Sequence, residues 1–167
     1  LVGAGLSVSG AIYQAVFGNP LVSPDILGVS SGAGFGAALA ILLSCGMAAT
    51  QVTALGCGLL AVVVVLNLSR IKRRSELFVL VLSGMALSAV CSAFSSFIVY
   101  FANNKEGMQS IAYWLMGSLA NVSYRDVLLC AAIEIPCLAV AMILRWKMNL
   151  LSLEQEEARS LGINVKK

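Results

Sequence analysis

The chain has 167 residues, of which 59% are hydrophobic and 11% charged, with a formal net charge of +3 and a mean hydropathy of +0.92. So few polar side chains cannot cover a water-soluble globule of this size, which argues against a soluble domain. Histidine is absent, and the sequence has no phosphate-binding loop, nucleophile elbow or paired-carboxylate motif. We therefore expect no enzyme, no metal site and no cofactor in this chain.

Charged residues and helix breakers divide the chain into apolar segments. A transmembrane helix needs about 20 predominantly apolar residues, and residues 26–69 and 77–104 carry no charge at all. We expect an all-α polytopic transmembrane helical bundle with five spans, at residues 1–17, 26–43, 49–68, 77–102 and 127–144. Because the chain lacks an initiating Met and a signal peptide, we expect residues 1–147 to be a single truncated membrane domain.

The second segment follows a turn and is rich in small residues. Ser23 and Pro24 supply an N-cap and a first-turn proline for its helix. Gly28, Gly32 and Gly36 recur every four residues and so share one helix face, where small residues let helix backbones approach closely in lipid. We assign these three glycines to helix packing. The alternative is that their open backbone permits the helix shifts of a transport cycle.

A basic cluster at residues 70–74 separates the third and fourth segments. Basic residues near span ends are retained in the cytoplasm, so this loop is predicted to be cytoplasmic. Alternation then places residues 103–126 outside and Arg145 and Lys147 in the cytoplasm. A lipid- or nucleic-acid-binding patch is the alternative, but topology explains the cluster without a ligand, and we expect no nucleic-acid partner.

The fourth segment carries a hydroxyl-rich face. Its serines lie close to one side of the helix, and an asparagine follows them: Ser88, Ser92, Ser95, Ser96 and Asn103. This face predicts an uncharged translocation pathway. Serines also hold helices together by hydrogen bonding, so a packing role is equally open.

Two further residue types in the apolar segments need an interpretation. Glu134 is the one carboxylate within an apolar span, and an intramembrane acid is a functional candidate, with a tolerated position near the interface as the alternative. The cysteines have neither metal-ligand nor redox spacing, so we expect small core residues at Cys45, Cys57, Cys91, Cys130 and Cys137.

The two polar regions carry their own patterns. In the outer loop, Tyr113 and Trp114 fit an interfacial aromatic belt. After the last span, Ser152 and Gln155 form a capping box, and Gly162 can end the helix that follows. This helix of about nine residues, roughly 13 Å long, is too short to span a membrane. Its apolar stripe has to pack against a partner, and a solvated juxtamembrane helix is the alternative.

Three stretches resemble the iron-siderophore, haem and cobalamin (FecCD-type) family of ABC-importer permeases. They are the two-proline turn and glycine-rich helix start at residues 18–34, the stretch Trp114-Leu115-Met116-Gly117-Ser118-Leu119, and the stretch Ala158-Arg159-Ser160-Leu161-Gly162. The resemblance covers nearly the whole chain. It implies that the chain corresponds to spans two to six of about ten, with the first coupling element at residues 148–167.

The resemblance also implies a function and partners. The chain would be part of an importer permease in the bacterial cytoplasmic membrane that moves an iron-siderophore complex, or haem or cobalamin. ATP would be hydrolysed by a partner ATP-binding subunit, contacted through Leu153, Ala158, Arg159, Leu161 and Gly162. Implied partners include a second permease copy, membrane lipid, and a substrate-binding protein docked above an outer mouth formed by Tyr113, Trp114, Gly117 and Ser118.

One departure from the family pattern concerns the coupling contact, because many relatives have Gly-Glu where this chain has Glu154-Gln155. A different class of function also stays open from the sequence. A small non-transporting helical membrane scaffold or interaction protein would have the same composition, with no ATP-binding partner for its short helix.

Overall fold

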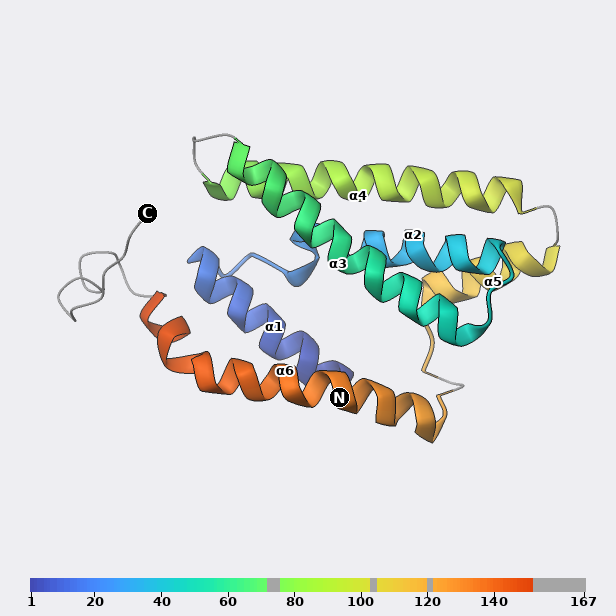
Figure 1. Ribbon diagram of the computed structural model, residues 1–167. Helices are drawn as coiled ribbons and strands as arrows, with labels where there is room; N and C mark the ends of the chain where they lie inside the picture. The colour runs from blue at the N-terminus through green and yellow to red at the C-terminus, as the bar shows by residue number, and fades with distance from the viewer. Residues whose placement is uncertain (72–75, 103–104, 120–121, 152–167) are drawn as a thin grey trace. The chain divides into compact units, whose positions relative to one another are not determined.

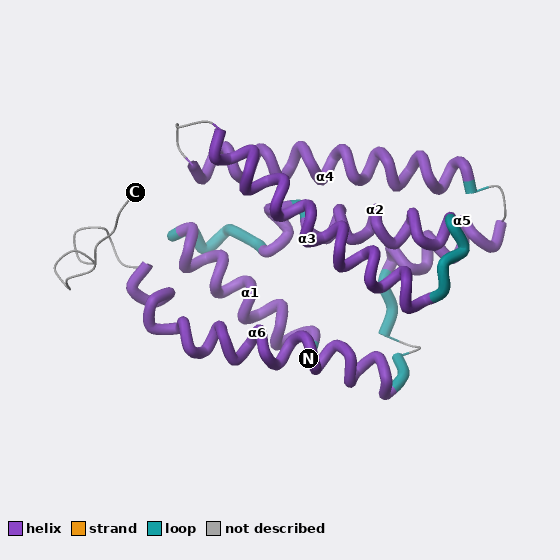
Figure 2. The backbone as a smooth tube through the Cα atoms, viewed as in Figure 1, coloured by secondary structure: helices purple, strands orange, loops and turns teal. Residues whose placement is uncertain are grey.

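The computed structural model describes residues 1–71, 76–102, 105–119 and 122–151. Every regular element in these ranges is a helix and none is a strand (Figures 1 and 2), so the predicted all-α fold is confirmed. Contacts group the chain into two units, one of residues 25–120 and one of residues 1–24 with 121–167. Each unit is described by itself.

The larger unit is built on four α-helices preceded by a short 3-10 helix. Their bounds are η1 (Pro24–Leu27), α2 (Val29–Leu42), α3 (Met47–Ile71), α4 (Glu76–Phe101) and α5 (Lys105–Met116). In Figure 1, α2 lies beside both α3 and α4, and its contacts with them are the most extensive in the chain. The short helix α2 is therefore the centre of this unit.

The start of α2 differs from the sequence expectation of residue 26. Pro24 opens a single 3-10 turn, and Gly28 then adopts the left-handed conformation with φ of 71°. A left-handed residue cannot continue a right-handed helix, and glycine adopts it without steric cost. The α-helix consequently begins at Val29, and Gly28 is its N-cap residue.

Close backbone contact joins α2 to α3. A Cβ placed on Gly32 would lie 2.8 Å from the Cβ of Ala61, and one on Gly36 would lie 2.6 Å from the carbonyl oxygen of Thr53. Both distances are shorter than real Cβ contacts, so the two helices meet at a separation that only glycine allows. Because the contacted residue numbers on α3 fall as those on α2 rise, the two helices are antiparallel.

Gly28 has a different neighbour from Gly32 and Gly36. It lies against α4, where its Cβ would meet the Ser88 hydroxyl at 2.8 Å and the Gly84 carbonyl oxygen at 3.1 Å. A Cβ on Gly84 would in turn collide with the backbone carbonyl of Ile26. The three glycines predicted to share one packing face therefore contact two different helices. The turn at Gly28 directs the backbone of this residue away from the face of α2 that carries Gly32 and Gly36.

The helix α5 is attached to α2 and α4 by an apolar cluster. Ile111 is fully buried and packs with Ala38 and Ile98, surrounded by Phe35 and Val99. Phe35 also stacks against Phe94, with ring centroids 6.0 Å apart. Since contacts at Gly28, Phe35 and Ala38 meet successively later positions of α4, these two helices are parallel.

The smaller unit is a pair of parallel helices, α1 (Val2–Phe17) and α6 (Tyr124–Leu151). The helix α1 ends at Gly18, whose φ is 58°, and Asn19 donates its backbone N–H to the Gln14 carbonyl at 3.2 Å. A capping box opens α6, because the Ser123 N–H and hydroxyl donate to Asp126 at 3.0 and 2.8 Å. These caps explain why α6 begins at Tyr124, before residue 127.

Among the described residues, three helices are long and apolar enough to cross a membrane, in the ranges Met47–Ser69, Phe78–Phe101 and Tyr124–Asn149, whereas Val2–Phe17 and Val29–Leu42 are shorter apolar helices. The expectation of core cysteines is wrong for three of the five. Cys45, Cys130 and Cys137 are exposed, and only Cys57 and Cys91 are half-buried. Cys45 lies in the turn between α2 and α3, and Cys130 and Cys137 lie at positions of α6 that the described helices leave uncovered.

Candidate functional site: a hydroxyl-lined cavity between α2, α4 and α5

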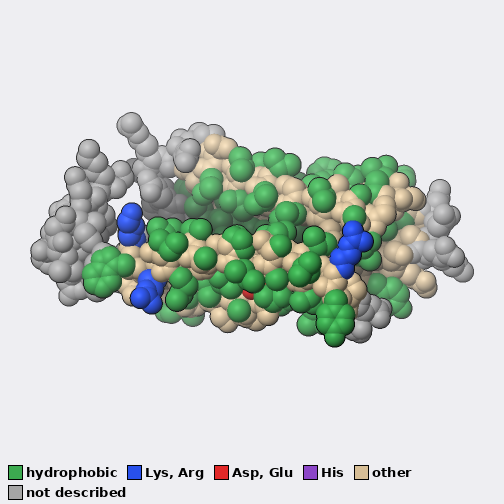
Figure 3. All heavy atoms as spheres, turned by 60° about the horizontal axis from the view of Figure 1, so that its bottom comes forward, with side chains coloured by type: hydrophobic (Ala, Val, Ile, Leu, Met, Phe, Trp, Pro, Cys, Tyr) green, Lys and Arg blue, Asp and Glu red, His purple; other side chains and the backbone are tan. Residues whose placement is uncertain are grey.

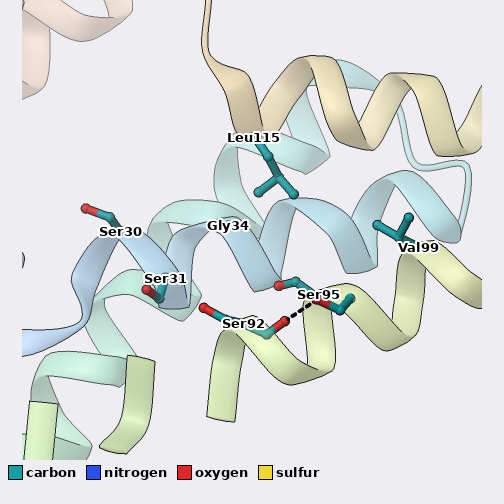
Figure 4. Close-up of a pocket in the computed structure, with 8 residues that line it drawn as sticks. Ser30, Ser31, Gly34, Ser92, Ser95, Val99 and Leu115 are labelled. Carbon is teal, nitrogen blue, oxygen red and sulfur yellow. Dashed lines mark hydrogen bonds between the residues drawn. The ribbon is translucent and has the colours of Figure 1, made fainter. Parts of the chain in front are cut away.

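A cavity of the larger unit lies between α2, α4 and α5 and has a volume of about 500 Å³. Five serine side chains supply its polar surface, namely Ser30 and Ser31 of α2 and Ser92, Ser95 and Ser96 of α4. Gly34, Val99 and Leu115 complete the lining, and no charged residue is among these. Figure 4 shows Ser31 and Ser92 facing each other across the cavity.

The α4 serines differ in how their hydroxyl groups are engaged. Ser95 donates to the Cys91 carbonyl and Ser96 donates to the Ser92 carbonyl, each at 2.9 Å. Their protons therefore stay on their own helix, and the oxygen lone pairs remain available as acceptors. The hydroxyls of Ser31 and Ser92 form no hydrogen bond with another described group, so they are available as donors as well.

Gly34 and Leu115 determine the shape of the wall that α5 contributes. A Cβ on Gly34 would lie 3.0 Å from a terminal methyl group of Leu115, so the absent side chain provides the space into which Leu115 points (Figure 4). Gly34, Ser30 and Val99 line the cavity although they were not among the residues predicted for the pathway. A signal was available for Ser30 and Gly34, because the stretch Ser30-Ser31-Gly32-Ala33-Gly34 gives α2 small residues on every side.

The four serines predicted to line the pathway have different neighbours in the structure. Ser92, Ser95 and Ser96 line the cavity, whereas Ser88 lies one turn earlier against the backbone of Gly28. Ser88 therefore fills a helix contact, the role that was the open alternative for all four serines. Asn103 lies outside the described residues.

The residues predicted for the outer mouth belong to α5 and the turn after it. Tyr113 is exposed, Trp114 is half-buried, and Gly117 ends the helix with φ of 70°. The helix therefore stops at Met116, with the exposed Ser118 just beyond it. Among the described side chains of this helix, Leu115 alone reaches the cavity lining. The coupling residues Leu153, Ala158, Arg159, Leu161 and Gly162 all lie outside the described residues.

Glu134 belongs to the smaller unit and lies against α1. Its carboxyl oxygen Oε1 is buried, has no hydrogen-bond partner among the described groups, and would be 2.9 Å from a Cβ on Gly5. Two residues later, Pro136 lies within α6 and provides no N–H for the helix ladder. The absence of a side chain at Gly5 thus leaves the space that the carboxyl group occupies.

The described residues that line the serine cavity can form hydrogen bonds and apolar contacts but no ion pairs. Its volume is within the range of small-molecule pockets, but the lining offers hydroxyl groups and apolar surface without a fixed charge. Such a wall hydrogen-bonds a polar molecule in passage without holding it strongly. A conducting pathway needs this balance, because binding must be weak enough to allow release.

The comparisons with known proteins agree with one another. The family model of the FecCD transport family matches residues 1–167. The chain is 44% identical over 165 residues to an iron chelatin transport system permease protein of Helicobacter pylori, covering 98% of this chain and 49% of that protein. It is also 39% identical over 166 residues to the molybdate import system permease protein MolB of Haemophilus influenzae, with 98% and 49% covered.

A third relative is the vitamin B12 import system permease protein BtuC of Escherichia coli, 38% identical over 164 residues, with 98% of this chain and 50% of that protein covered. Among solved structures, an inward-facing ABC transporter described as of metal-chelate type matches with a TM-score of 0.87 and 36% identity, over 98% of this chain and 52% of that one. The chain spans about half the length of the curated relatives that it matches. The polytopic helical fold and the matched family model lead to one conclusion: the chain belongs to the FecCD transport family.

Proposed function

We propose that this chain is the pathway-forming part of a permease subunit in an ABC importer, and that the importer carries a bulky metal chelate across the bacterial cytoplasmic membrane. The observation that carries the proposal is the cavity lined by Ser31, Ser92, Ser95 and Ser96, since it offers hydroxyl groups without charge within a membrane-protein fold. Family membership supports the same role. A partner subunit would hydrolyse ATP.

Among the substrates suggested by the relatives, we favour a ferric siderophore. The relatives are named for molybdate, iron chelatin and vitamin B12, so family membership alone leaves the choice open. A small oxyanion such as molybdate is held best by cationic groups and backbone N–H donors. None of the described residues that line the cavity is a cation, which favours a large chelate whose own ligands enclose the metal.

Helix directions support the membrane topology that we propose. Alternation from the cytoplasmic loop at residues 70–74 requires α1, α3 and α6 to run inward and α2 and α4 to run outward. The contacts agree with this, because α1 is parallel to α6, α2 is parallel to α4, and α2 is antiparallel to α3. The cavity would then open toward α5, on the outer side where a substrate-binding protein would dock.

The pathway assignment is tested by narrowing the cavity. In full-length permease carrying this chain, reconstituted with its ATP-binding subunit and binding protein, we expect the double change S92L and S96L to reduce ferric-siderophore uptake at least tenfold. The matched control is A89L with A93L, which adds similar bulk to exposed positions of the same helix outside the cavity. Native uptake by the serine variant, with the control also unaffected, would show that the pathway runs elsewhere.

The coupling assignment needs a separate test, since residues 148–167 are proposed to contact the ATP-binding subunit. We expect A158D to abolish co-purification with that subunit and substrate-stimulated ATP hydrolysis, because an unpaired charge buried in an interface costs several kcal/mol. The control is E156Q, which by helical spacing changes the opposite face of the short helix. Normal complex yield with A158D would contradict the coupling role without affecting the pathway test.

A further inference from the structure

The α1–α6 pair carries a second cavity, a groove of about 170 Å³ along one side of the two parallel helices. Apart from Arg145 and Asn149 near the C-terminal end of α6, its described lining is apolar and includes Ile12 of α1 and Met142 and Met148 of α6. Methionine side chains are flexible and polarisable, so they adapt to irregular apolar ligands. This groove is separate from the serine cavity, since all its lining residues belong to the smaller unit.

A cationic group stands at one end of the groove. Arg145 is part of the lining and is exposed, and it forms no ion pair with any described residue. None of the described residues that line the groove is acidic, and Glu134, the preceding acid in α6, is eleven residues earlier, about 16 Å along the helix. Among the described residues, none competes with an anion for the guanidinium group.

Because the two helices are parallel, the groove has one end with a cationic side chain and one apolar end. Arg145 is close to the C-terminal ends of α1 and α6, whereas the lining extends in the other direction to Val8. Figure 3 shows basic side chains at the ends of α6 and hydrophobic side chains over the length between them. In the proposed topology this cationic end lies at the cytoplasmic surface of the membrane.

We propose that this groove binds one anionic phospholipid, with its phosphate on Arg145 and an acyl chain between α1 and α6. Charge complementarity carries the choice of occupant, because guanidinium groups bind phosphate in bidentate geometry and basic pockets between transmembrane helices suit anionic headgroups. The apolar walls supply the surface that a hydrocarbon chain covers. The lipid would hold together two helices in which hardly any side chain is buried.

The test measures phosphatidylglycerol retained by full-length permease carrying this chain, by native mass spectrometry from detergent with defined lipid added. We expect R145Q to weaken retention about fivefold, the effect of removing one basic charge near the membrane surface. The matched control is K147Q, which removes the same charge two residues later from a position that does not line the groove. Equal losses in the two variants would overturn the proposal in favour of unspecific surface attraction.

A second variant tests the apolar part without changing any charge. Ala15 lines the groove, and A15F is expected to fill it and reduce phosphatidylglycerol retention at least fivefold, while thermal stability in phosphatidylcholine stays unchanged. Native retention by A15F would exclude the groove as the site. Displacement of the lipid by millimolar inorganic phosphate would indicate a plain anion site, and a wild-type protein that retains no lipid would mean that protein covers the groove. Either result overturns the proposal.

Discussion

The two units of this chain hold their helices together by different means. In the larger unit, α2 buries Gly32, Gly36, Ala37 and Ala38 and its backbone touches that of α3, while the turn at Gly28 before it touches the backbone of α4. In the smaller unit, α1 has no buried residue and the candidate span of α6 has none either. Lipid is as apolar as leucine, so helices in a membrane gain little by hiding large apolar side chains and gain more by close backbone packing.

This difference indicates how each unit is stabilised. Small residues let α2, α3 and α4 make dense van der Waals contact, which makes the larger unit stable by its own packing. The smaller unit presents large side chains outward, including Leu128, Ile143 and Trp146 at 72–78% exposure. One contact between its helices is made by the end of a long side chain, Glu134, which lies against Gly5. We therefore expect substitutions at the helix contacts to damage the larger unit much more than the smaller one.

The largest effect is expected for G36L. A Cβ at this position would be 2.6 Å from the Thr53 carbonyl and 2.8 Å from the Cys57 Cβ, so α2 and α3 would have to separate, at a cost of about 3 kcal/mol. Thermal unfolding in detergent measures this cost. The control is G56L in α3, where no atom lies within 4 Å of the added Cβ. Equal stability of the two variants would refute close packing as the basis of this unit.

An intermediate effect is expected for G84A. The added methyl group would collide with the Ile26 backbone, which cannot rotate away as a side chain would, so we expect a loss of about 2 kcal/mol. The control G58A places a Cβ at an ordinary 3.4 Å from the Val29 carbonyl, and it should be neutral or stabilising. If G84A unfolds at the wild-type temperature, the 3-10 turn before α2 is not fixed against α4.

The smallest effect is expected in the smaller unit, for G5A. Here the added Cβ meets the flexible end of Glu134, which can move, so the steric cost of about 1 kcal/mol roughly cancels the gain in helix propensity. G3A and G10A, with no atom within 4 Å, should gain the full propensity benefit. In a variant that also carries E134A, the G5A change should gain the full helix-propensity benefit, because the contacted side chain is gone. A loss as large as that of G36L would remove the contrast between the units.

Much of the candidate site was accessible from the sequence because it depends on local spacing. The helical period puts Ser92, Ser95 and Ser96 on one side of α4 whatever surrounds them, and they line the cavity together. The same period could not separate Ser88 from them, since its neighbour is decided by where the turn before α2 meets α4. Ser30, Gly34 and Leu115 join the cavity only because three helices converge there.

Composition and periodicity determined the fold class of this protein, since uncharged stretches of this length form helices in a membrane whatever their neighbours are. The tertiary structure determined which neighbouring helix each glycine contacts. Gly28 and Gly32 look equivalent at a four-residue spacing, yet the left-handed turn at Gly28 directs it to α4 while Gly32 packs on α3. A repeat specifies a face of a helix, but only the packed neighbours determine what that face touches.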